Sequence, residues 1–231
     1  MIILEGVTAG SAAADKESAV LRNVSVELPS NRRVVILGHA KSGKTTLINL
    51  LAGLMLPDAG TIKRFARLSF PIGYWKIFDP QMTVHGNIMF IAERYGSDPD
   101  EVLMFLDRAL GLSGALEESI SSVSRQMKVR LSYALGYALH YDTYLIDNNA
   151  VAGDPDFRGL CEGLFESRIR ESGMIFVTSR PEMAKRYGEV GGTLMGGKLT
   201  IYDDVNVAVA SFLEGERRSA EVLYRGAAQL K

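Results

Sequence analysis

The first residues of the chain alternate between short apolar runs and turn-forming stretches. Residues 2–5 and 20–28 are short, partly alternating apolar runs, a pattern typical of strands with one buried face. The segment 9–14 between them is rich in Gly, Ala and Ser, a composition that favours a turn. The pattern predicts an antiparallel pair of strands at the start of the fold.

Three later apolar runs, at residues 33–37, 143–147 and 174–178, are continuous rather than alternating. Continuous runs of this length are typical of strands that are buried on both faces. Helices are predicted from about residue 44 to residue 52 and over 156–171, between those runs in the chain. Strands that alternate with helices predict an α/β fold with a mostly parallel core sheet.

A mostly helical stretch is expected from about residue 84 to residue 140. Apolar residues recur at helical spacing in 88–95 and 101–110, and Pro99 between two aspartates marks a helix start. We expect a helical subdomain over 84–140, within a single domain of residues 1–231. The side chains predicted to face the core of these helices are Met89, Phe90, Tyr95, Phe105, Tyr133 and Tyr137.

Two further patterns describe the C-terminal part of the chain. Gly196 and Gly197 stand between the apolar runs 193–195 and 199–202, which is the signature of a β-hairpin. Residues 214–231 are strongly charged, and we expect them to form a C-terminal tail, either as a terminal helix or frayed.

Composition restricts the classes of function. The formal net charge of −1 gives no electrostatic reason to expect a nucleic-acid partner. The single cysteine, Cys161, excludes an internal disulfide and suits a reducing compartment. The longest apolar run, residues 50–56, is shorter than a membrane span, and Glu5 interrupts the N-terminal apolar stretch too early for a signal peptide. We therefore expect a cytoplasmic protein.

Residues 38–46 match the GxxxxGK[ST] pattern of a phosphate loop, placed between a strand and a helix. Two glycines let the backbone curl so that its N–H groups point at a polyphosphate, and the helix N-terminus adds a positive dipole end. A flexible glycine turn would leave the Lys and Thr unexplained. The predicted nucleotide-binding residues are Gly38, His39 (interpreted as a spacer), Ala40, Lys41, Ser42, Gly43, Lys44, Thr45 and Thr46.

A magnesium site is predicted beside this loop. Lys44 should reach the terminal phosphates, whereas the Thr45 hydroxyl should ligate Mg²⁺. Asp147 ends the predicted strand 143–147 and is the candidate second acid for the metal. The alternative interpretation of Asp147 is a helix cap or a solvated turn acid.

Several longer motifs resemble one family. They are the run Gly53–Ile62, the segment Ser69–Gly73 with Met82, Thr83 and Asn87 after it, the run Met127–Leu131 and the run Asp147–Asp154. On these motifs, over roughly residues 1–210, the chain resembles ATP-binding subunits of ABC transporters, most closely those of capsular polysaccharide exporters. They are more specific than the phosphate loop alone, and they disfavour a non-transport NTPase or switch protein.

The resemblance implies a P-loop NTPase core of the ABC ATPase type that binds ATP and Mg²⁺. In that family two subunits enclose two nucleotides, and each site joins one subunit's phosphate loop to the other's signature motif. Ser124 and Asp154 would then face the partner's nucleotide across a homodimer or heterodimer interface. A membrane permease would dock on the helical subdomain, with Tyr74 and Trp75 as alternative contacts. That docking would place the chain at the inner face of the plasma membrane.

The positions that activate water in the family are altered here. Asn148 stands where the family has a catalytic Glu, and Ser179 stands where its switch His is expected, beside Arg180. An amide can hold a water molecule but cannot take its proton. Removing a carboxylate also removes repulsion toward the γ-phosphate, on the order of 3 kcal/mol at ~5 Å and an effective dielectric of ~20. The change therefore favours retention of ATP over its hydrolysis.

Other family positions also differ. The signature reads Val123–Met127 and carries Gln126 in place of a Gly, although Ser124 is kept. Ser11 stands where an adenine-stacking aromatic is expected, and no Gln lies near Tyr74. We predict an exporter subunit with weak hydrolysis. The alternatives are a working ATPase that tolerates Asn148, and an inactive regulatory or structural subunit that pairs with an active ATPase.

Overall fold

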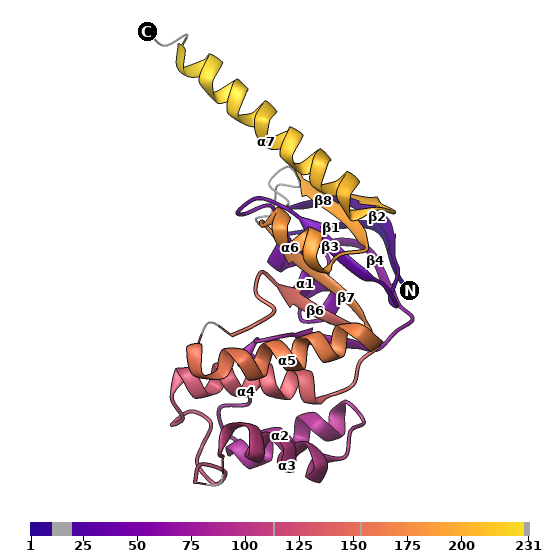
Figure 1. The fold of residues 1–231 in the computed structure, drawn as a ribbon. Helices are drawn as coiled ribbons and strands as arrows, with labels where there is room; N and C mark the ends of the chain where they lie inside the picture. Colours follow the sequence, from indigo (N-terminus) through magenta and orange to yellow (C-terminus); the bar gives the residue numbers. More distant parts are fainter. Residues whose placement is uncertain (11–19, 113, 153, 229–231) are drawn as a thin grey trace.

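A mixed sheet of six strands forms the core of the computed structural model, which describes residues 1–10, 20–112, 114–152 and 154–228, with side chains up to residue 218 (Figure 1). All neighbouring strands are parallel except the last pair, a hairpin. The predicted mostly parallel sheet and the hairpin are confirmed. In spatial order the strands are β5 (Leu68–Pro71), β6 (Thr143–Asp147), β7 (Gly173–Thr178), β3 (Arg33–Leu37), β8 (Val190–Met195) and β9 (Lys198–Tyr202).

A separate antiparallel sheet is formed by β2 (Leu21–Leu28), β1 (Ile2–Ala9) and β4 (Ala59–Arg64), in that order. Every second residue of β1 is buried along most of its length, as expected for a strand with one face on the core. The predicted antiparallel pair is confirmed. Both of its strands pack in a hydrophobic cluster that they share with residues of β3. Most of the predicted turn, from residue 11 onward, lies outside the described residues.

The helices are α1 (Lys44–Ala52), α2 (Val84–Arg94), α3 (Pro99–Leu110), α4 (Arg125–Ala138), α5 (Pro155–Glu171), α6 (Pro181–Tyr187) and α7 (Val205–Ala228). A short 3₁₀ turn, η2 (Trp75–Ile77), follows β5. Figure 1 shows α2 and α3 at the end of the molecule farthest from α7. In the part of the chain with described structure, no helix is long and apolar enough to span a bilayer.

The start of α7 differs from the expected tail. The helix begins at Val205, and Val209 and Phe212 are buried. The charged residues from 214 onward continue the same helix, so the change in composition did not mark a structural boundary.

One of the predicted core side chains is wrongly placed. Phe90 is 57% exposed because the buried face of α2 consists of Val84, Asn87, Ile88 and Ile91, and Phe90 lies outside that stripe. Tyr133 and Tyr137 are buried as predicted.

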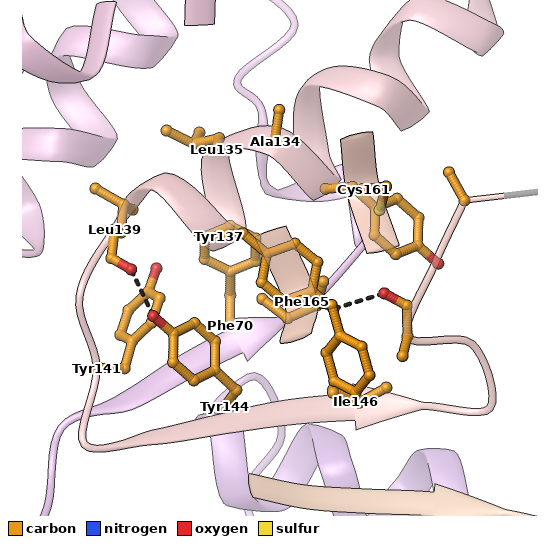
Figure 2. Close-up of a cluster of buried hydrophobic side chains, with 14 of the residues drawn as sticks. Phe70, Ala134, Leu135, Tyr137, Leu139, Tyr141, Tyr144, Ile146, Cys161 and Phe165 are labelled. Carbon is orange, nitrogen blue, oxygen red and sulfur yellow. Dashed lines mark hydrogen bonds between the residues drawn. The ribbon is translucent and has the colours of Figure 1, made fainter. Parts of the chain in front are cut away.

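An aromatic cluster joins α4 and α5 to the edge of the core sheet (Figure 2). Tyr141 meets Phe70 and Tyr144 edge-on, with interplanar angles of 86° and 89°. The Tyr144 hydroxyl donates to the Leu139 carbonyl at 2.8 Å, and the Tyr137 hydroxyl donates to the Ala150 carbonyl at 2.6 Å. The cluster therefore fixes the helical layer against the strand that ends in Asp147.

Candidate nucleotide-binding site

The loop between β3 and α1 curls because two of its residues adopt positive φ. Gly43 has φ 102°, and a Cβ atom there would lie 2.5 Å from a Val20 methyl group, so no other residue fits without movement. Lys41 has φ 63°. The amide of Gly38 donates to the Thr178 carbonyl at 3.0 Å, which ties the start of the loop to β7. Since α1 begins at Lys44, its N-terminus is directed at the loop as predicted.

Lys44 is buried inside the loop, with 6% of its surface exposed. Its ammonium donates to the carbonyls of Gly38 at 2.8 Å and His39 at 2.5 Å. Burial lowers the pKa of Lys44, and the nearby Asp147 carboxylate partly offsets that effect. The charge is thus satisfied by neutral carbonyl acceptors, and a phosphate oxygen would be a stronger partner.

Thr45 and Asp147 meet although they are distant in sequence. The Thr45 hydroxyl donates to an Asp147 carboxylate oxygen at 2.6 Å, because α1 begins and β6 ends at the same edge of the core sheet. A hydroxyl and a carboxylate oxygen side by side match the oxygen ligands that Mg²⁺ prefers.

The space beside these residues fits a polyphosphate. A hollow of about 350 Å³ is lined by Val20, Ala40, Lys41, Gly43, Lys44, Thr45, Thr46 and Asn148. The Ser42 hydroxyl is buried and has no hydrogen-bond partner among the described residues, so a donor remains for a ligand. The donor set, the curled backbone and the paired oxygens together suit a nucleotide triphosphate with magnesium.

Asn148 is held at three points next to this hollow. Its side-chain nitrogen donates to Asp147 at 3.2 Å, and its amide donates to the Val177 carbonyl at 2.8 Å. Its backbone carbonyl accepts from the Arg180 guanidinium at 2.9 Å. Its φ of 61° lies in the left-handed region, which Asn tolerates. Ser179 is exposed just after β7. Asn148 and Ser179, the predicted replacements for the family's base and switch histidine, carry neither a carboxylate nor an imidazole.

The loop after Asn148 is fastened to one face of α4. Tyr133 donates to the Asn149 carbonyl at 3.1 Å, and Tyr137 donates to the Ala150 carbonyl. Arg130 pairs with Asp154, and this hydrogen bond lowers the pKa of Asp154 to about 2. Positions 130, 133 and 137 lie on one helical face, being three and four residues apart. The sequence pattern identified the two tyrosines only as core residues and did not indicate the ion pair of Arg130.

Ser124 and Asp154 do not line the hollow of their own chain. Ser124 caps α4 by accepting from the Met127 amide at 3.2 Å, and Asp154 caps α5. Gln126 hydrogen-bonds the Asp154 carboxylate. A role for these residues at a second subunit's nucleotide stays a prediction. Ser11 lies outside the described residues.

His39 is a phosphate-loop residue whose side chain contacts another element of the fold. Its ring stacks on Phe212 of α7 rather than lining the hollow. No local sequence signal marks this contact, because the two residues are far apart in the chain and belong to different elements.

The parallel sheet, the phosphate loop after β3 and the acid at the end of β6 define a phosphate-loop nucleotide-binding protein. Residues 21–151 match the ABC transporter family. The chain belongs to this family, which implies that it binds a nucleotide.

Curated relatives match most of the chain. The ATP-binding protein BexA of Haemophilus influenzae is 33% identical over 86% of this chain and 91% of its own length. The capsule polysaccharide export ATP-binding protein CtrD of Neisseria meningitidis serogroup B is 33% identical over 82% of this chain and 88% of its own. The polysialic acid transport ATP-binding protein KpsT of Escherichia coli is 28% identical over 92% and 98%, respectively.

Solved structures share the fold at low sequence identity. An ATP-binding subunit of an ABC transporter aligns with a TM-score of 0.68 at 21% identity, over 88% of this chain and 90% of that one. A dimeric ATP-binding cassette in a post-hydrolysis state, bound to ADP and phosphate, aligns with a TM-score of 0.67 at 18% identity, over 88% and 98%. These alignments confirm the predicted ABC ATPase fold.

Proposed function

We propose that this chain is the ATP-binding subunit of an ABC exporter for capsular or another cell-surface polysaccharide. The relatives named for capsule polysaccharide export and polysialic acid transport support this assignment, since each is covered over most of its length. ATP-dependent closure of a dimer would be coupled to transport. The partners would be a membrane permease subunit and a second ATP-binding subunit, either identical or different, and the chain would lie at the inner face of the plasma membrane.

The phosphate loop would hold the triphosphate with its own groups. Lys44 would exchange its bonds to the Gly38 and His39 carbonyls for phosphate oxygens, and the Ser42 hydroxyl has a free donor for the same purpose. Thr45 and Asp147 would hold Mg²⁺. The metal would neutralise phosphate charge.

Weak hydrolysis is the second part of the proposal. The observation that carries it is the placement of Asn148, whose side-chain nitrogen donates to Asp147 while its backbone carbonyl accepts from Arg180. A positioned general base contributes about 10²- to 10⁴-fold to such reactions, and a carboxamide cannot accept the proton. Ser179 adds a second loss, although losses of this kind do not simply multiply.

The same observation favours one alternative. A subunit that binds ATP without hydrolysing it can act as the structural or regulatory half of an asymmetric dimer with an active ATPase. The proposed exporter ATPase and this inactive subunit are distinguished by the rate at which this chain hydrolyses ATP in the presence of the exporter partners.

Titration with a fluorescent ATP analogue and Mg²⁺ tests the binding half of the proposal. We expect saturable binding that Lys44→Ala reduces by at least about tenfold, because it removes the charged hydrogen bonds to phosphate. We also expect turnover of the isolated protein far below one per second. Absence of saturable binding, together with no effect of Lys44→Ala, would overturn the proposal, and turnover of several per second would overturn its hydrolysis part.

A further inference from the structure

The C-terminal helix α7 lies against the strand that leads into the phosphate loop. It packs on β8, β3 and α6, and its buried side chains include Val205, Val209 and Phe212. Figure 1 shows that α7 then continues past the sheets, away from the rest of the molecule. Its first turns are thus part of the core beside the nucleotide site.

Two residues of α7, one helical turn apart, contact the phosphate-loop residue His39. The rings of His39 and Phe212 are stacked, with centroids 4.6 Å apart and an interplanar angle of 29°. A carboxylate oxygen of Glu216 lies 3.5 Å from His39 Nδ1, an ion pair when the imidazole is protonated. Phe212 is only 1% exposed, so the surface on which His39 rests is anchored in the core.

The backbone of His39 contacts the loop groups that would bind phosphate. Its carbonyl accepts from the Lys44 ammonium at 2.5 Å and from the Ser42 amide at 3.2 Å. His39 therefore connects α7, through its side chain, with Lys44 and Ser42, through its carbonyl.

We propose that Phe212 and Glu216 are positioning residues of the nucleotide site, acting through His39. When Lys44 turns from the His39 carbonyl to a phosphate, the loop loses a hydrogen bond that maintains its shape. The contacts of its side chain with α7 keep His39 in place and hold the phosphate loop in its ligand-binding shape. The entropy cost of ordering the loop on binding is therefore lower. This inference rests on the proposed binding of ATP.

The coupling must be reciprocal. If the α7 contacts raise the affinity for ATP, then bound ATP must stabilise those contacts by the same free energy. A purely structural packing role for Phe212 would stabilise the fold without this dependence on nucleotide.

Binding of the fluorescent ATP analogue with Mg²⁺ by Phe212→Leu, Glu216→Gln and wild type tests the inference. We expect each variant to bind about threefold to tenfold more weakly. Glu214→Gln is the matched control, because it removes a carboxylate of the same helix that pairs with Arg218 and not with His39. The control should bind like wild type. Equal affinity of wild type, Phe212→Leu and Glu216→Gln would overturn the inference while leaving ATP binding intact.

Hydrogen exchange of the amides of residues 205–218, with and without the ATP analogue, supplies the second readout. We expect added protection in wild type and in Glu214→Gln, and less in Glu216→Gln. Binding by wild type without added protection of α7 would contradict the inference. If Phe212→Leu fails to fold, Glu216→Gln decides alone, because its side chain is on the surface. Lack of binding by wild type itself would instead refute the proposed function.

Discussion

Asn148 is the residue on which we expect the balance between ATP binding and ATP hydrolysis to depend. Its carboxamide donates to Asp147, so the side chain faces the acid that is predicted to bind the metal, while its backbone carbonyl accepts from Arg180. A carboxylate at this position would be repelled by Asp147 and would turn toward the hollow. There it would be able to contact an attacking water molecule. We therefore expect the identity of this side chain to decide whether the site can hydrolyse ATP as well as bind it.

We expect the double variant Asn148→Glu, Ser179→His to raise MgATP turnover by about 10²-fold, since it restores a base and a polar partner for it. Asn148→Glu alone should give a smaller increase and a stability loss of about 1 kcal/mol, because Glu tolerates the left-handed φ poorly. Steady-state phosphate release measures the effect. Adding Lys44→Ala to the double variant is the control and should return turnover to background. A double variant that binds ATP but hydrolyses it at the wild-type rate would contradict the prediction.

The residues of the phosphate loop could be predicted from sequence because their spacing within one short segment determines the local backbone. The approach of Thr45 to Asp147 was also predictable, since both lie where elements of a parallel sheet end. The contact of His39 with Phe212 was not, because it joins two segments through tertiary packing that leaves no periodic trace. The exposure of Phe90 was missed because apolar spacing alone did not identify the buried face of α2.

At the scale of elements, α4 connects three segments in which the sequence resembles family motifs. Ser124 begins the helix, Tyr133 packs against Gly73 in the segment after β5, and Tyr133 and Tyr137 hold the loop after Asn148. A Cβ atom on Gly73, whose φ is 81°, would lie 2.6 Å from the Tyr133 ring. One helix thus fixes the relative positions of Ser124, the segment after β5 and the loop that carries Asp154.

Tyr137→Phe should loosen that loop. Removing the hydroxyl leaves the buried Ala150 carbonyl without its donor, a loss of about 1–3 kcal/mol in the free energy of unfolding. Tyr144→Phe is the matched control, because Tyr144 is equally buried and donates to Leu139 at the other end of the same cluster (Figure 2). Urea unfolding should show a loss of stability in both variants. Hydrogen exchange of residues 148–152 should become faster only in Tyr137→Phe, and equal exchange in both variants would refute the role assigned to this tyrosine.

At the scale of the whole molecule, the phosphate loop and the start of α4 are the two parts of one subunit that the family resemblance predicts to meet different nucleotides. The phosphate loop is complete, whereas the start of α4, the predicted signature, carries Gln126, which hydrogen-bonds Asp154 within its own chain. In an enclosed dimer of the family, that end must approach the partner's nucleotide closely. A glycine permits such an approach of backbone to ligand, and a glutamine side chain obstructs it. We therefore expect the chain to supply a working phosphate loop but a poor signature.

We therefore expect the isolated protein to remain a 25.2 kDa monomer with MgATP, because a homodimer would place the obstructed end at both nucleotides. Gln126→Gly should increase the dimer fraction, as measured by light scattering after size-exclusion chromatography. Gln126→Gly combined with Lys44→Ala is the control and should stay monomeric, since the nucleotide that joins the subunits is not retained. Dimerisation of wild type as strong as that of Gln126→Gly would show that two identical chains close on ATP. A monomeric wild type would instead assign the second signature to a different subunit.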